Sequence, residues 1–291
     1  MTIAIYLPLL LALPLSPVAR RIAARGAPGV AARGLTAVAL IAAFCSTWSL
    51  VLLALTLLDD VPPLAALDDS PGLNLPEPVP GPVALVAALL LAWGVVRLVR
   101  DGHRRVDTHR RLRAAGSSPD GLVVADWTVP LAVAVPGKPG HLLVTSGMLR
   151  LLDADERRVV FAHERAHLGH RHHRLVAAAA AAAAMNPLLA GVRDMVAYLV
   201  ERQADEDAAA TVGDRDLTAQ AVARAALATL APVGGLGIHS GAAVDRVRAL
   251  GEPRPLPQRR RLIGPLLVGA ACLLAIGVAT AEFVELARAW L

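Results

Sequence analysis

The sequence has little cysteine, and four long stretches of it have almost no charge. The two cysteines, Cys45 and Cys272, both fall inside these stretches, which excludes a disulfide framework and favours a packing role for each. The stretches cover residues 2–18, 35–58, 83–99 and 262–281. Their one charged side chain is Arg97, near the end of the third. Spans without charges have nothing to line an ion path, which argues against a metal transporter.

The composition predicts a membrane protein. Of the 291 residues, 55% are hydrophobic, and the mean hydropathy is +0.53. Each apolar stretch is long enough, or nearly so, to cross a hydrocarbon core of roughly 30 Å. We therefore expect four membrane-spanning helices, although Pro8, Pro14 and Pro17 interrupt the first.

The charges between the stretches predict the orientation, because short loops rich in Lys and Arg stay in the cytoplasm. Four arginines separate the first two stretches, whereas residues 59–81 carry five acidic residues and no basic one. We expect the N-terminus outside and residues 100–261 at the inner face of a bacterial-type cytoplasmic membrane. No basic residue precedes the first stretch, which argues against a cleaved signal peptide. Basic loops beside anionic lipid explain the pI near 10.1 without direct nucleic-acid binding.

The cytoplasmic segment has the pattern of a small sheet followed by helices. Short runs at 122–125, 131–135 and 142–145 are separated by prolines and glycines, as strands are. Asp153 to Glu156 has the form of a helix N-terminus with an acidic first turn. The sequence thus predicts a multi-pass α-helical membrane protein with a cytoplasmic α+β domain. Its parts are residues 1–99 with three spans and a short external loop at 59–81, the domain at 100–261, and residues 262–291 with a fourth span and a short external tail.

The expected helix after Asp153 carries the letters HERAH at residues 163–167. Residues four apart share a helix face, so His163 and His167 can direct imidazole nitrogens at one metal ion. Zinc fits this pair, because neutral imidazoles hold a borderline-soft ion. Glu164 then supplies the carboxylate that takes a proton from water attacking a peptide carbonyl. The pattern alone is only moderately specific and needs a third ligand.

Glu201 is the best candidate for the third ligand, 34 positions beyond His167. Asp205 lies four residues further on the same face, where it can hydrogen-bond the far nitrogen of a ligand histidine and fix its tautomer. Glu206 and Asp207 compete by chemistry, but neither begins an acidic pair at this spacing. Alone, this charged run is typical of a solvated helix face. With HERAH in the same chain, it predicts one zinc ion per chain.

Residues 175–192 separate the two motifs and are apolar enough to be a fifth span. They include eight consecutive alanines, and Asn186 is their only polar side chain. A single crossing would put His167 and Glu201 on opposite sides of the membrane, which the zinc assignment excludes. Pro187 also interrupts the stretch. We expect a helix packed in the domain or lying against the membrane, with a re-entrant hairpin as the alternative.

Three further histidines, His170, His172 and His173, follow the motif. A second metal site is one interpretation. We favour a basic helix end beside the inner leaflet, where cations also complement the helix dipole, and assign no metal to these residues.

The substrate is expected to lie extended along an edge strand, held by backbone hydrogen bonds. The candidate strand consists of Leu142, Leu143, Val144, Thr145 and Ser146.

These features together resemble the integral-membrane gluzincin peptidases of families M48 (HtpX-like and CAAX-prenyl-protease-like) and M56 (BlaR- and MecR-like). The resemblance rests on LAVAVPG from Leu131, LLVTSGML from Leu142, LDADERRVVFAHERAH from Leu152, NP from Asn186 and ERQAD from Glu201. Three spans before the domain and one after it are more similar to M56. The resemblance implies a zincin-like catalytic domain with zinc on His163, His167 and Glu201, Glu164 as general base, and Asp205 behind the ligands.

His239 and Arg246 resemble an M48 segment in which Thr-His-Pro is followed by an arginine. On that resemblance His239 would stabilise the transition state. Here Ser240 replaces the proline and the spacing is one residue longer, so the sequence favours an exposed loop histidine.

The resemblance implies a protein or peptide substrate cut at the cytoplasmic face. Similarity to M56 implies signal transduction by cleavage of a transcriptional repressor of the BlaI type, and similarity to M48 implies quality control of membrane proteins. The penicillin-binding domain of BlaR-like receptors has no counterpart after residue 281, so direct β-lactam sensing by that route is not expected. A non-enzymatic receptor or scaffold that kept the fold is a further alternative, against which the intact Glu164 argues. The oligomeric state stays open.

Overall fold

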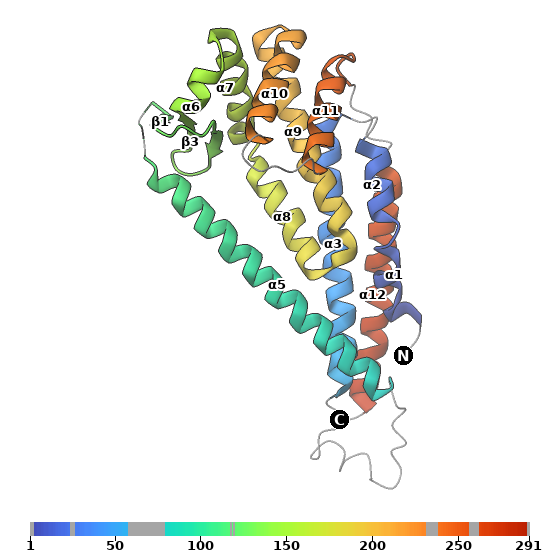
Figure 1. Ribbon diagram of the computed structural model, residues 1–291. Coiled ribbons are helices and arrows are strands. Elements are labelled where there is room, and N and C mark those ends of the chain that lie inside the picture. Colours follow the sequence, from blue (N-terminus) through green and yellow to red (C-terminus); the bar gives the residue numbers. More distant parts are fainter. Residues whose placement is uncertain are drawn as a thin grey trace.

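The computed structural model describes residues 3–23, 27–57, 79–116, 118, 120–230, 238–255 and 262–289. Long helices form a bundle at one end of the molecule, and a sheet with shorter helices forms a head at the other (Figure 1). The bundle contains η1 (Ile3–Ile5), α1 (Leu7–Leu11), α2 (Leu15–Ala23), α3 (Pro28–Leu55), α5 (Gly81–Ala114) and α12 (Ile263–Ala289). The head contains β1 (Leu122–Ala125), β2 (Ala132–Val135), β3 (His141–Thr145), α6 (Ser146–Leu151), α7 (Ala154–Gly169), α10 (Arg215–Leu230) and α11 (Ile238–Leu250). Between them lie α8 (His172–Met185), η3 (Pro187–Leu189) and α9 (Ala190–Val212).

Within the described residues, three helices are long and apolar enough to cross a membrane: α3, α5 and α12. They correspond to the helices predicted over 35–58, 83–99 and 262–281, with shifted ends. Large apolar side chains such as Leu89 and Leu274 are 61% and 72% exposed, as expected of surfaces that face lipid. Helix α5 continues past its apolar half and leaves the bundle obliquely to reach the sheet (Figure 1).

The prediction of one spanning helix over 2–18 is wrong. The chain forms η1, α1 and α2 in succession, with a turn over residues 12–14 between α1 and α2. Pro14 explains this break, because it donates no backbone hydrogen bond and disfavours the helical conformation of Leu13. Helix α2 is amphipathic: Leu15 and Ala19 are buried in a core shared with α3, α8 and α9, whereas Arg20 is exposed. Most of the predicted external loop at 59–81 lies outside the described residues.

The three strands pair in the order β1-β3-β2. β1 runs parallel to β3, from Leu122 opposite Leu142, and β2 runs antiparallel, with Val133 opposite Leu143. All five residues of β3 are buried. The prediction of an edge strand at 142–146 is therefore wrong, because β3 pairs with β1 on one side and β2 on the other and occupies the centre of the sheet.

Helix α7 begins where the sequence predicts. The Asp153 carboxylate accepts from the amides of Asp155 and Glu156, and the Glu156 carboxylate accepts from the Asp153 amide at 3.0 Å. This reciprocal cap satisfies amide groups that would otherwise lack partners at the helix start. It fixes the first turn of the helix that carries HERAH.

Residues 172–212 form a helical hairpin whose turn lies within 175–192. That this segment lies against the membrane or re-enters it stays a prediction. Helix α8 runs from the head toward the bundle, the chain turns at Asn186 and η3, and α9 returns to the head along α3 (Figure 1). At the turn, the Asn186 side-chain amide donates to Ser46 Oγ of α3 at 3.1 Å, and its oxygen accepts from the Leu188 amide. Arg97 of α5 donates to the carbonyl of Ala183 at 3.2 Å. Alanines on α8 let these backbones approach closely.

We predict that Ser46→Ala destabilises the hairpin, because it leaves the buried Asn186 amide without its acceptor. Interhelical hydrogen bonds among membrane helices contribute about 0.6 to 1.7 kcal/mol, and a loss of that size is expected in unfolding experiments in detergent. The matched control is Ser49→Ala, one turn further along α3, whose hydroxyl bonds only the carbonyl of Cys45 in its own helix. Equal stability losses in both variants would contradict the docking role of Ser46.

Candidate functional site

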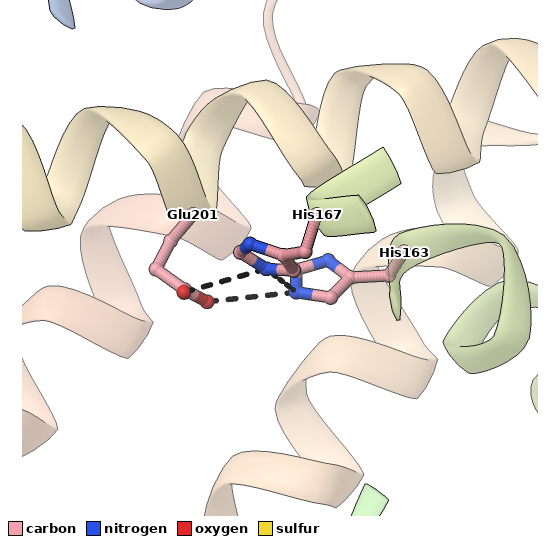
Figure 2. Close-up of side chains that lie close together, drawn as sticks. All are labelled: His163, His167 and Glu201. Atoms are coloured by element: carbon pink, nitrogen blue, oxygen red, sulfur yellow. Dashed lines mark hydrogen bonds and ion pairs between the residues drawn. The ribbon is translucent and has the colours of Figure 1, made fainter. Parts of the chain in front are cut away.

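His163, His167 and Glu201 come together where α7 crosses α9. The two histidine Nε2 atoms are 3.0 Å apart, and each lies 3.5 Å from an oxygen of Glu201 (Figure 2). Residues four apart on α7 supply the nitrogens, and the facing turn of α9 supplies the carboxylate. Among the described residues this is the one cluster of three metal-binding side chains with converging ligand atoms.

The donor set fits zinc. Two imidazole nitrogens and one carboxylate leave a fourth position open, as in catalytic zinc sites. Ligand atoms bound tetrahedrally at about 2.0 to 2.2 Å are about 3.3 to 3.6 Å apart. The observed separations of 3.0, 3.5 and 3.5 Å are close to that spacing.

Asp205 and Arg246 hold the outer side of His163. His163 Nδ1 lies 3.0 Å from Asp205 Oδ1, so the imidazole is oriented with Nε2 toward the cluster. Arg246 of α11 donates to both oxygens of Asp205 at 2.7 Å and lies 3.1 Å from Glu201 Oε2. The expected pairing of Asp205 with a ligand histidine is thus present. In the sequence, Arg246 stands out only as part of the M48-like segment that contains His239. In the structure Arg246 holds the carboxylates of Asp205 and Glu201 in place.

The charges of this cluster favour a cation. Burial disfavours the charged form of His163, but Asp205 and Glu201 outweigh burial and raise its pKa to about 10. Burial also opposes ionisation of Glu201, yet His163, His167 and Arg246 hold its pKa well below the usual range. An ionised Glu201 beside a position that attracts positive charge suits a divalent metal ion.

His167 is held on its outer side by another histidine. Its Nδ1 lies 3.0 Å from Nδ1 of His172, whose Nε2 lies 3.2 Å from Gln203 Oε1. Burial lowers the pKa of His167 to about 4 and also lowers that of His172, so both imidazoles are neutral. Sequence spacing did not reveal this contact, because five residues do not return to the same face of a continuous helix. Arg171, with φ of 54°, breaks the helix and turns His172 back.

Glu164 lies beside the metal cluster, against the edge of the sheet. Its Oε2 accepts a hydrogen bond of 2.7 Å from the amide of Ala134 in β2. Burial raises its pKa to about 7, partly offset by His163. A carboxylate with this pKa can both accept and release a proton near neutral pH.

A cavity of about 1340 Å³ opens over the cluster. His163, Glu164, Glu201 and Arg246 line it together with Ala132 of β2. Much of its wall is small or apolar: Val160 of α7, Val222 and Ala225 of α10, and Ala242 and Ala243 of α11. The cavity therefore has room for a chain segment next to the polar cluster.

Of the other expected residues, those that the structure describes do not line this cavity. None of residues 142–146 is among the described residues that line it, because 142–145 lie in the central strand and Ser146 begins α6. His239 is the second residue of α11, and its side chain lies outside the described residues. Glu206 binds Arg215 at 2.7 Å and Asp207 binds His170 at 2.7 Å, so neither competing acid points at the cluster.

Comparison with known proteins finds one family model. The model of peptidase family M48 matches residues 101–261, more than half of the chain. A protein described as "Protease HtpX homolog" from Aeropyrum pernix is 45% identical over 62 residues, which is 20% of this chain and 19% of that protein. The match thus spans about a fifth of the relative's length. No solved structure matches the chain.

We predict that Glu201→Ala abolishes stoichiometric zinc binding, because two imidazoles alone leave the site without its anionic ligand. Metal content of the purified variant, measured by plasma mass spectrometry, checks this. Asp207→Ala is the matched control on the same helix, since its carboxylate faces His170 and Arg254 instead. Zinc retained at full stoichiometry in Glu201→Ala would mean that another carboxylate is the third ligand.

Proposed function

Because the chain belongs to peptidase family M48, we propose that it is a membrane-bound zinc metalloendopeptidase in which HERAH and Glu201 form the active site. The observation that carries the proposal is the convergence of His163, His167 and Glu201 beside a cavity that His163, Glu164 and Glu201 line. The intact Glu164 argues against a receptor or scaffold that merely kept the fold. A structural metal site needs no carboxylate of raised pKa beside it.

The roles follow from the positions of the side chains. His163, His167 and Glu201 hold one zinc ion, which when bound polarises the scissile carbonyl and acidifies a water molecule. Glu164 takes a proton from the attacking water and passes it to the leaving amine, for which its pKa near 7 is suited. Asp205 and Arg246 keep His163 and Glu201 in orientation.

The proposed place for the substrate is the outer edge of β2, in place of the strand at 142–146. The amide of Ala134 points away from β3, since it donates to Glu164. By the alternation of an antiparallel pair, the amide and carbonyl of Ala132 point the same way, and Ala132 lines the cavity. An extended peptide can pair with this edge and pass Glu164 and the metal ligands.

The arrangement of the ends supports a cytoplasmic active site. The start of α3, the end of α5 and the start of α12 lie toward the head (Figure 1). Arg20 and Arg21 are in the last turn of α2, just before α3, and Arg100 is in the half of α5 that leads to the sheet. Short basic segments stay on the inner side of the membrane. The head with its metal site would then face the cytoplasm, with 59–81 outside.

For the biological role we favour quality control of membrane proteins. The family match and the resemblance to an HtpX homologue support this choice. A second candidate is regulatory cleavage of a repressor of the BlaI type, as in M56. Its support is the order of the chain, in which α3 and α5 precede the site and α12 follows it. An adjacent gene for a winged-helix repressor would favour this second role.

We predict that Glu164→Gln lowers the rate of peptide cleavage by about 100- to 10,000-fold or more while zinc stays bound, because the amide cannot accept the proton. Cleavage of a fluorogenic peptide library by the purified protein, with metal content measured in parallel, checks this. Wild-type rates in the variant would rule out Glu164 as the general base.

We also predict that Ala132→Pro raises KM with little change in metal content, because it removes an amide from the proposed substrate edge. Proline is tolerated on edge strands. The control is Val124→Pro on β1, the other edge strand. The amide of Val124 points away from β3, because the residues on either side of it in β1 make the hydrogen bonds to β3. If both variants cleave like the wild type, the substrate does not pair with β2.

A further inference from the structure

The turn between α7 and α8 brings His172 back onto the metal ligand His167. Helix α7 ends at Gly169, Arg171 takes the left-handed conformation, and α8 starts at His172. The His172 side chain is 1% exposed, although histidine is polar and sits at the start of a helix. A fully buried polar side chain needs partners for its nitrogens. Both are present: His167 on one side and Gln203 on the other.

If Nε2 of His167 binds a metal, only one placement of the hydrogens allows both hydrogen bonds, from His167 to His172 and from His172 to Gln203. Nε2 of His167 faces Glu201 and His163, so it must be free of a hydrogen to bind a metal. The neutral imidazole then carries its hydrogen on Nδ1 and donates it to Nδ1 of His172. His172 in turn carries its hydrogen on Nε2 and donates it to Oε1 of Gln203. The amide oxygen of Gln203 is an acceptor and closes the chain.

The far end of this chain rests on a membrane helix. Gln203 is 9% exposed and lies over Gly29, the second residue of α3. A Cβ added to Gly29 would meet Gln203 Oε1 at 2.5 Å and the rest of the amide at 2.6 and 2.8 Å. The absence of a side chain at position 29 therefore leaves the space that the Gln203 amide fills.

We propose that His172 is the positioning residue of His167, and that Gln203, seated on Gly29 of α3, sets the tautomer of both histidines. The two metal-binding histidines are thus oriented by different groups. His163 is oriented by the carboxylate of Asp205, and His167 is oriented by the neutral Nδ1 of His172. The hydrogen bonds from His167 through His172 to Gln203 end on α3. The geometry of the metal site therefore depends on how the head packs on the bundle. The inference rests on the proposed zinc site.

The test measures zinc affinity of the full-length protein in detergent, by competition with a chromogenic chelator. The wild type comes first, since its failure to bind one zinc ion per chain would refute the proposed function itself. His172→Leu keeps the buried volume but removes the acceptor. We expect its zinc affinity to fall about 10- to 100-fold, the usual loss when the hydrogen-bond partner of a ligand histidine is removed.

His172→Asn is the conservative variant, because its side-chain oxygen can accept from Nδ1 of His167. It should recover most of the lost affinity, which a merely structural role for His172 would not predict. Wild-type affinity in His172→Leu, or no recovery in His172→Asn, overturns the proposal.

Gly29→Ala tests the far end without touching either histidine, and decides the matter should His172→Leu fail to fold. The added methyl group displaces the Gln203 amide, so zinc affinity should fall in the same direction. Gly34→Ala is the matched control: its Cβ would meet the Leu262 side chain at the same 2.5 Å, away from the hydrogen-bond chain. Equal zinc affinities in the two glycine variants would overturn the coupling to α3.

Discussion

The side chains of His163 and His167 on α7 converge with that of Glu201 on α9, although 33 residues separate His167 from Glu201 in the chain, and this convergence constrains the path of the chain between them. The chain between them leaves the head as α8, turns at Asn186 and returns as α9. Because the hairpin closes on itself, the intervening apolar segment packs against the bundle helices without separating the ligands. The contacts of Asn186 with Ser46 and of Arg97 with Ala183 then fix the depth of the turn. The convergence of these three side chains is thus linked to how the head is joined to the bundle.

The same site concentrates buried charge, and its parts balance one another. The negative charges of Glu201 and Asp205 are stabilised by Arg246 and His163, whereas Glu164 keeps a raised pKa because burial acts on it with less compensation. Two carboxylates on neighbouring turns of α9 and one on α7 therefore have different protonation chemistry. In the proposed function, this difference assigns metal binding and orientation to Glu201 and Asp205, and proton transfer to Glu164.

The sequence predicts the elements that follow from local rules and misses those that follow from pairing in space. The capping of α7 by Asp153, the strands near 122 and 142, and the shared face of Glu201 and Asp205 are local, and all are present. Alternation and apolar character cannot show which of three short strands lies in the centre, so 142–146 was misplaced at an edge. The apolar run at 2–18 is broken because the prolines outweigh hydropathy there. The contact of His172 with His167 depends on the conformation of Arg171, which composition does not reveal.

We propose that His163, His167 and Glu201 bind one zinc ion at the meeting point of α7 and α9. Crystals of the full-length protein grown with zinc, and diffraction data collected on both sides of the zinc absorption edge, test it directly. The account predicts a single anomalous peak within bonding distance of Nε2 of both histidines and an oxygen of Glu201. A peak elsewhere, for example at His170 and Asp207, with none at this cluster, would contradict it.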